Sequence, residues 1–185
     1  MDRPLSATSL PSPTNLRAEY TERMAEIRRA FEEAGDGLAT IAARSTLVDT
    51  IVTRLWAAEV EKEPALKKGI AVCAIGGYGR SHLFPCSDID LLFCAEKNEA
   101  EAARNAIRLV SQSLWDCGLK VSPMTRKMSE CERFSPENAE FGMALLDRRL
   151  ITGDAATFAK LDEKIRTKML VKDVKSIRAE IVTLT

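Results

Sequence analysis

The chain has 185 residues, of which 45% are apolar, enough for one folded unit with a real core but not for several independent domains. Acidic and basic residues balance at 27 each, so no overall positive field would hold the protein on nucleic acid. No apolar run approaches the length of a membrane span, and residues 1–13 lack the basic start and apolar core of a signal peptide. The composition favours a cytoplasmic protein that binds neither nucleic acid nor a membrane.

The chain opens with a segment rich in Pro, Ser and Thr, residues 1–13, which predicts a flexible leader. Residues 14–63 then carry apolar side chains at steps of three and four, and Gly35 stands where a first helix would end. This pattern predicts an N-terminal α-helical hairpin.

The middle of the chain, residues 64–135, alternates strand and helix patterns. In order, these are strands at 70–75 and 89–94, a helix at 98–117 and a strand at 119–126. Residues 136–185 are helical in pattern, with Gly153-Asp154 as a break and cap, and the last helix pattern stops at residue 185 without a cap, as in a truncated chain. Together these patterns predict an α+β fold.

The five cysteines, an odd number, stand far apart and include no Cys-x-x-Cys pair that would suggest zinc or redox chemistry. We expect most of them to be buried, reduced thiols. They are Cys73, Cys86, Cys94, Cys117 and Cys131.

Asp88 and Asp90 stand at the start of the second strand pattern, two positions apart. Side chains at i and i+2 of a strand project to the same side, so both carboxylates should lie together while Ile89 and Leu91 face a core. Two adjacent carboxylates repel unless a cation lies between them or they share a proton. Hard oxygen ligands of this kind suit Mg²⁺ or Mn²⁺, held partly by substrate phosphates. The spacing therefore predicts a metal site with Asp88 and Asp90 as its catalytic residues.

A glycine-rich turn, Gly76-Gly77-Tyr78-Gly79-Arg80, separates the first two strand patterns. Its glycines let the backbone bring N–H groups close to an anion, and phosphate is the expected guest. Ser87 can add a hydroxyl donor and Arg80 a positive charge. A glycine cluster alone is more often a tight turn, and an isolated Asp-x-Asp is usually a solvated strand end. Their order, strand, glycine turn, paired acids, strand, favours a nucleotide and metal site.

These residues resemble the amino-terminal nucleotidyltransferase domain of bacterial protein-PII uridylyltransferases, in the polymerase-β-like superfamily. The resemblance covers about residues 65–165, and it implies a small mixed sheet flanked by helices. Its strongest segments are Gly76-Gly77-Tyr78-Gly79-Arg80, Leu83-Phe84-Pro85, Ser87-Asp88-Ile89-Asp90-Leu91-Leu92, Leu114-Trp115-Asp116, Gly118-Leu119, Arg149-Leu150-Ile151 and Gly153-Asp154.

The resemblance implies transfer of UMP from UTP to a PII-like protein acceptor, with release of pyrophosphate. By the same resemblance, Gly76 and Gly77 would cradle the triphosphate while Asp88 and Asp90 bind Mg²⁺ or Mn²⁺. Two other functions stay open. The domain would be a nucleotide-binding regulatory module with weak or absent turnover, or it would modify a small molecule.

The third strand departs from the family pattern at Lys120. Family members usually read Leu-Glu-Val-Gly-His-Ser where residues 119–124 of this chain read Leu-Lys-Val-Ser-Pro-Met. In the wider fold this strand commonly supplies a third carboxylate. Asp116 or Glu130 would then supply the acid, the site would work on two aspartates, or the domain would bind without turnover. Lys120 can itself contact a phosphate, which places it among the nucleotide-binding candidates.

Further predictions concern the packing of five residues. Tyr78 is expected to pack the glycine turn rather than stack on a base. Trp56 and Trp115 stand at helical spacing among apolar neighbours and are expected in the core. Arg148 and Arg149 are expected on a solvated helix face.

Overall fold

The computed structural model describes residues 13–97 and 100–184. The predicted leader lies outside the described residues except for Pro13, where the first helix begins. The helices are α1 (Pro13–Ala34), α2 (Gly37–Lys62), α3 (Gly76–Gly79), α4 (Glu101–Asp116), α5 (Met128–Cys131), α6 (Ala139–Ala144), α7 (Ala155–Lys164), α8 (Leu170–Lys172) and α9 (Val174–Leu184). The strands are β1 (Ile70–Ala74), β2 (Ile89–Ala95), β3 (Val121–Lys127) and β4 (Arg149–Gly153). Short 3-10 segments, η1 (Pro64–Lys67) and η2 (Pro136–Asn138), and a π-helical segment, η3 (Ile165–Met169), complete the described chain.

In the described part of the chain, the four strands form one mixed sheet in the order β3-β2-β1-β4. Strand β1 runs antiparallel to both β2 and β4, whereas β2 and β3 are parallel. A parallel pair needs a crossover connection, and α4 provides it here. The structure is therefore an α+β protein with a four-stranded mixed sheet, as the sequence predicted at that level.

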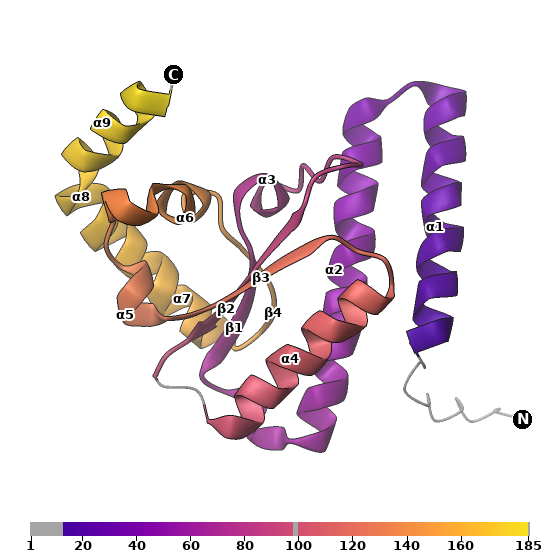
Figure 1. The fold of residues 1–185 in the computed structure, drawn as a ribbon, viewed down its shortest axis with the longest axis horizontal. Coiled ribbons are helices and arrows are strands. Elements are labelled where there is room, and N and C mark those ends of the chain that lie inside the picture. Colours follow the sequence, from indigo (N-terminus) through magenta and orange to yellow (C-terminus); the bar gives the residue numbers. More distant parts are fainter. Residues whose placement is uncertain (1–12, 98–99, 185) are drawn as a thin grey trace, which may run out of the picture.

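Helices cover both faces of the sheet (Figure 1). On one face, α2 contacts β4 and α4 contacts β3, and Val52, Trp56 and Leu114 of these helices share a buried core with Phe93 of β2. On the other, η3 and the helices after β3 enclose Leu92 and Cys94. Because both faces of β2 are buried, its side chains are apolar at nearly every position rather than at alternate ones.

The helix ends lie where the sequence placed them. Gly35 follows α1 with φ of +69°, and its N–H donates to the Phe31 carbonyl. Gly118 follows α4 with φ of +85°. The Asp154 side chain accepts a hydrogen bond from the Ala156 N–H at 3.0 Å and so caps α7 as predicted.

Three packing predictions were wrong. Residues 136–185 were expected to be helical apart from a break, but β4 lies among them and forms an edge of the sheet. Trp115 is 48% exposed, because its ring lies at the end of α4 and its Nε1–H donates to the Val121 carbonyl at 3.1 Å. Arg148 and Arg149 lie on no helix, because Arg149 begins β4 and Arg148 directly precedes it. Both are half-buried and paired with carboxylates. Trp56, by contrast, is buried in the core as predicted.

The cysteines are all free thiols, and four of them are buried as expected. Cys86, in the segment between α3 and β2, is exposed. None of the helices among residues 13–97 and 100–184 combines the length and the apolarity that crossing a bilayer requires.

Candidate active site

The two aspartates lie where β2 begins. Asp90 is the second residue of the strand and is half-buried, whereas Asp88 precedes the strand and is exposed. The pKa of Asp90 is raised, first because burial removes water from the carboxylate and second because the Asp88 charge lies nearby. A bound cation would relieve both effects, so this pair is suited to holding one.

The glycine turn lies directly against Asp90. It forms α3, a single helical turn that follows β1, and the Ile75 N–H just before it donates to the Asp90 carbonyl at 3.2 Å. Gly76 has φ of +61°, and a Cβ built on it would lie 3.4 Å from Oδ2 of Asp90 and 3.7 Å from the Cβ of Ala144. The structure thus brings Gly76 and Asp90 together, as the predicted site requires.

Gly77 and Gly79 differ in what surrounds them. A Cβ on Gly77 would make only ordinary contacts, 3.5 Å from the His82 carbonyl oxygen and 3.9 Å from the Arg80 guanidinium. A Cβ on Gly79 would overlap the carbonyl oxygen of Asp147 and lie 2.7 Å from its carbonyl carbon. The site therefore has room for a Cβ at Gly77, whereas the space beside Gly79 is filled by backbone.

Arg80 reaches away from the carboxylate pair. Its guanidinium forms an ion pair with Asp147, which stands just before β4, and its side chain is 51% exposed. In this structure Arg80 therefore links the end of the glycine turn to the segment that precedes β4. The sequence did not predict this partner, because 67 residues separate the two.

Tyr78 packs the glycine turn against the core, as predicted. The ring is buried, and its hydroxyl donates to Asp49 of α2 at 2.6 Å. Arg149 of β4 donates to both oxygens of the same carboxylate, at 2.7 and 3.2 Å, and its guanidinium lies 5.5 Å from the Tyr78 ring centroid. Burial, followed by the Asp49 charge, raises the pKa of Tyr78, so the phenol stays protonated and remains a donor. Two elements distant in sequence, α2 and β4, thus hold the glycine turn in place.

A second connection ties the segment after the turn to α2. Leu83 is completely buried; its N–H donates to Oγ of Ser45 at 3.2 Å, and its carbonyl accepts from Arg44 at 3.4 Å. Ser45 in turn donates to the Ile41 carbonyl. Sequence reasoning missed both Arg44 and Asp49, whose places on a long helix suggested ordinary solvated charges.

Ser87 and Lys120 meet at the entrance to β2 and β3. Ser87 is half-buried, and its hydroxyl donates to the Phe84 carbonyl at 2.9 Å. Lys120 is exposed, and its carbonyl accepts from the Ile89 N–H at 2.8 Å, which places its backbone beside the start of β2. Both residues line one small pocket of about 230 Å³.

The structure places neither proposed substitute beside the aspartate pair as a third acid. Asp116 accepts a hydrogen bond from Gln112 at 2.9 Å, and Glu130 accepts from the Lys127 N–H at 2.7 Å at the far end of β3. Within the described residues, no group of three or more His, Cys, Asp or Glu side chains is arranged to hold a metal ion. Two carboxylates still fit Mg²⁺ or Mn²⁺, because these ions are commonly bound by one or two carboxylates together with substrate phosphates and water.

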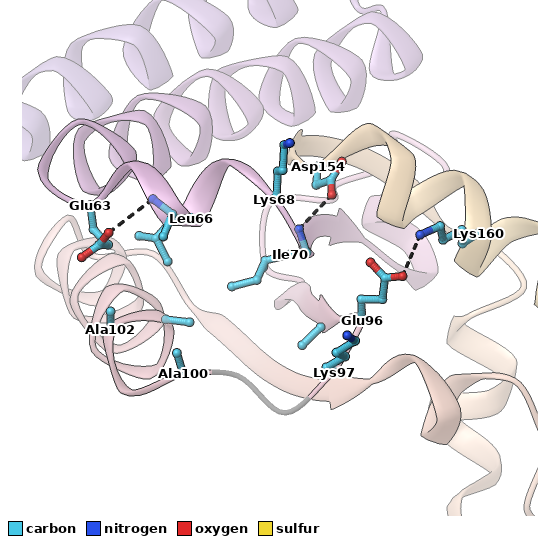
Figure 2. Close-up of a pocket in the computed structure, with 14 residues that line it drawn as sticks. Glu63, Leu66, Lys68, Ile70, Glu96, Lys97, Ala100, Ala102, Asp154 and Lys160 are labelled. Carbon is cyan, nitrogen blue, oxygen red and sulfur yellow. Dashed lines mark hydrogen bonds and ion pairs between the residues drawn. The ribbon is translucent and has the colours of Figure 1, made fainter.

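A second pocket, of about 470 Å³, lies at the opposite end of β2 (Figure 2). Some of its charged groups are engaged: Glu96 pairs with Lys160 at 2.6 Å, and Asp154 accepts from the Gly69 N–H at 2.8 Å. These contacts tie α7 to the ends of β1 and β2. The pocket is separate from the aspartate pair.

Curated proteins similar to this chain include two that are named bifunctional uridylyltransferase/uridylyl-removing enzyme. The protein from Rhodospirillum rubrum is 33% identical over 158 residues, which cover 82% of this chain and 17% of that protein. The protein from Aromatoleum aromaticum is 29% identical over 175 residues, which cover 91% of this chain and 20% of that protein. No protein-family model matches the chain. The chain is thus similar to part of these enzymes and spans about a fifth of their length.

Proposed function

We propose that this chain is a nucleotidyltransferase domain of polymerase-β-like fold that transfers UMP from UTP to a PII-like protein acceptor and releases pyrophosphate. The observation that carries the proposal is the closeness of Gly76 to the carboxylate of Asp90, since a Cβ built on Gly76 would lie 3.4 Å from Oδ2 of Asp90. It joins an anion-accepting turn and a cation-accepting pair in one site, which is what a metal–nucleotide substrate requires. The similarity to uridylyltransferase/uridylyl-removing enzymes supports UTP as the nucleotide.

In this proposal each residue has a defined task. The first N–H groups of the α3 turn, at Gly76 and Gly77, bind phosphate oxygens, because such groups have no partner within their own turn. Asp88 and Asp90 hold Mg²⁺ or Mn²⁺, which when bound activates the acceptor hydroxyl and stabilises the charge of the leaving pyrophosphate. The Ser87 hydroxyl, which donates to the Phe84 carbonyl in this structure, would turn to donate a hydrogen bond to the same phosphates.

A second candidate is a nucleotide-binding regulatory module without turnover. It is favoured by the absence, among the described residues, of a third acidic ligand beside the aspartate pair, and by Lys120 at the place where the wider fold commonly has that acid. An acceptor of low molecular weight is the remaining alternative within the transferase class.

The test is transfer of label from UTP, in the presence of Mg²⁺, to a purified PII-like protein, with pyrophosphate release measured in parallel. We expect both products with the parent chain and neither with Asp88→Asn or Asp90→Asn. Glu96→Gln is the matched control, because Glu96 directly follows β2 at its opposite end and pairs only with exposed Lys160 there. It should keep full activity.

The alternatives give different results. Nucleotide-dependent thermal stabilisation without transfer to any acceptor would favour the regulatory module; saturation at 100 times Kd corresponds to about 2.7 kcal/mol. Transfer to a small acceptor but not to protein would favour the low-molecular-weight alternative. The proposal would be refuted if no combination of nucleotide and metal gave either binding or transfer.

A further inference from the structure

The small pocket beside the aspartates has a lining of unusual charge. It measures about 230 Å³ and contains two cationic side chains, Arg44 and Lys120, and no acidic one. The helical hairpin supplies Tyr20 and Arg44, the segment before β2 supplies residues 85–87, and the start of β3 supplies residues 118–120. We call this space the Arg44–Lys120 pocket.

Arg44 is the most informative part of this lining. The residue is only 7% exposed, and its Nε is buried without a hydrogen-bond partner. Within the described part of the chain its guanidinium makes one hydrogen bond, to the Leu83 carbonyl, and this bond is long at 3.4 Å. A buried guanidinium costs free energy unless an anion or several acceptors satisfy it. Its burial in the wall of a pocket therefore calls for an anionic ligand.

The remaining lining fits a tetrahedral oxyanion. Lys120 is exposed and free to turn its ammonium towards the pocket, while Ser87 contributes a hydroxyl. A planar guanidinium, an ammonium and a hydroxyl are the groups that proteins use to bind phosphate. Asp88 directly follows Ser87, so the pocket adjoins the segment that carries the proposed metal ligands.

We propose that the Arg44–Lys120 pocket binds a phosphate group and that it does so without a metal ion. The phosphate belongs either to the nucleotide or to free inorganic phosphate. The first source deepens the proposed function and rests on it, since it adds a phosphate-binding site beside the glycine turn. It also gives Lys120, which replaces the expected acid, a positive task.

Cys86 offers a direct readout of occupancy. It lines the same pocket and is the exposed thiol, whereas the other four cysteines of the chain are buried. The rate at which N-ethylmaleimide alkylates Cys86, followed by mass spectrometry of the intact folded chain, therefore reports on this pocket. The reagent is uncharged, and the protection of each variant is measured relative to its own alkylation rate without ligand.

The experiment measures this rate in EDTA at constant ionic strength with inorganic phosphate, UTP, uridine or chloride. Phosphate at saturation should slow alkylation at least about fivefold, whereas uridine and chloride should not. Lys120→Gln should raise the phosphate concentration needed for half-protection about tenfold, the loss of one charge-assisted contact. Lys127→Gln is the matched control, because Lys127 is also exposed and lies at the other end of β3. Phosphate should protect Cys86 of this variant as it does in the parent chain.

Each outcome decides the matter. Protection by phosphate and UTP alike assigns the site to the nucleotide, whereas protection by inorganic phosphate alone assigns it to the free anion. Equal protection by uridine, no protection by either phosphate compound, or undiminished protection in Lys120→Gln would overturn the inference. The alkylation assay contains no metal, so its result is independent of the labelling assay. Protection of Cys86 without transfer of label would refute only the proposed function. Transfer of label without protection of Cys86 would refute only the phosphate site in this pocket.

Discussion

Two glycines of the turn differ in whether they can accept a Cβ: Gly79 is required for folding, whereas Gly77 has room for a larger side chain. Replacing Gly79 by Ala would place a Cβ within the van der Waals radius of the Asp147 carbonyl, 2.7 Å from its carbon, and 3.2 Å from the Ala74 carbonyl oxygen. Both neighbours are backbone, so no side chain can rotate away. Overpacking of this kind costs about 3 kcal/mol or more. For a chain of this length, such a loss lowers the melting temperature by roughly 6–12 °C.

Gly77→Ala is the matched control, since it is the same substitution two residues away in the same turn. Its Cβ would approach nothing closer than 3.5 Å. Alanine is favoured over glycine in a helix by up to about 1 kcal/mol, so this variant should be as stable as the parent or slightly more so. Thermal unfolding followed by circular dichroism compares the two. A Gly79→Ala protein that melts within about 2 °C of the parent would refute the reasoning.

Two further predictions concern the groups around the turn. The folded-state pKa of Asp90 is raised by burial and by Asp88, so the folded protein binds the Asp90 proton more tightly than the unfolded chain does. The protonated carboxyl group therefore adds stability at low pH, and this stability is lost as pH rises through the folded-state pKa. Asp90→Asn should therefore melt above the parent at pH 7, and the difference should vanish as pH falls to about 4; a constant difference at both pH values would contradict this origin. Tyr78→Phe removes the hydrogen bond to Asp49, which keeps its bonds from Arg149. It should lower the free energy of unfolding in urea by about 1.5 kcal/mol, and Asp49→Asn should reduce that effect, whereas equal effects in both backgrounds would exclude the bond as the cause.

The sheet could be read from the sequence where burial is complete. Strands β1 and β2 are short apolar runs that end in glycine or charge, and their positions followed from that pattern. Strand β4 lies at the edge, and its first four residues, Arg149 to Thr152, are half-buried with no alternation. Its sequence therefore resembled the helical segments around it. Only pairing with β1, more than seventy residues earlier, makes it a strand.

The site divides in the same way between local and distant contacts. The alternation of a strand places Asp88 and Asp90 together, and the glycine turn must follow β1, so the sequence predicted both. The partners that hold the turn are distant: Asp49 is 29 residues from Tyr78 and 100 from Arg149. No periodicity relates residues so far apart. Trp115 shows the opposite error, because an apolar residue near a helix end need not face the core.

Helix α2 sets a limit on how small an active fragment of this protein can be. It contributes Val52 and Trp56 to the core beneath β2, and its preceding turns supply Asp49 to Tyr78 of the glycine turn and Ser45 to the segment after that turn. A fragment that begins at Ile70 would keep both aspartates and every glycine of the turn. It would nevertheless expose one face of the sheet and leave the turn with no support on that side. The proposed chemistry would therefore depend on a helix that carries none of the predicted catalytic residues.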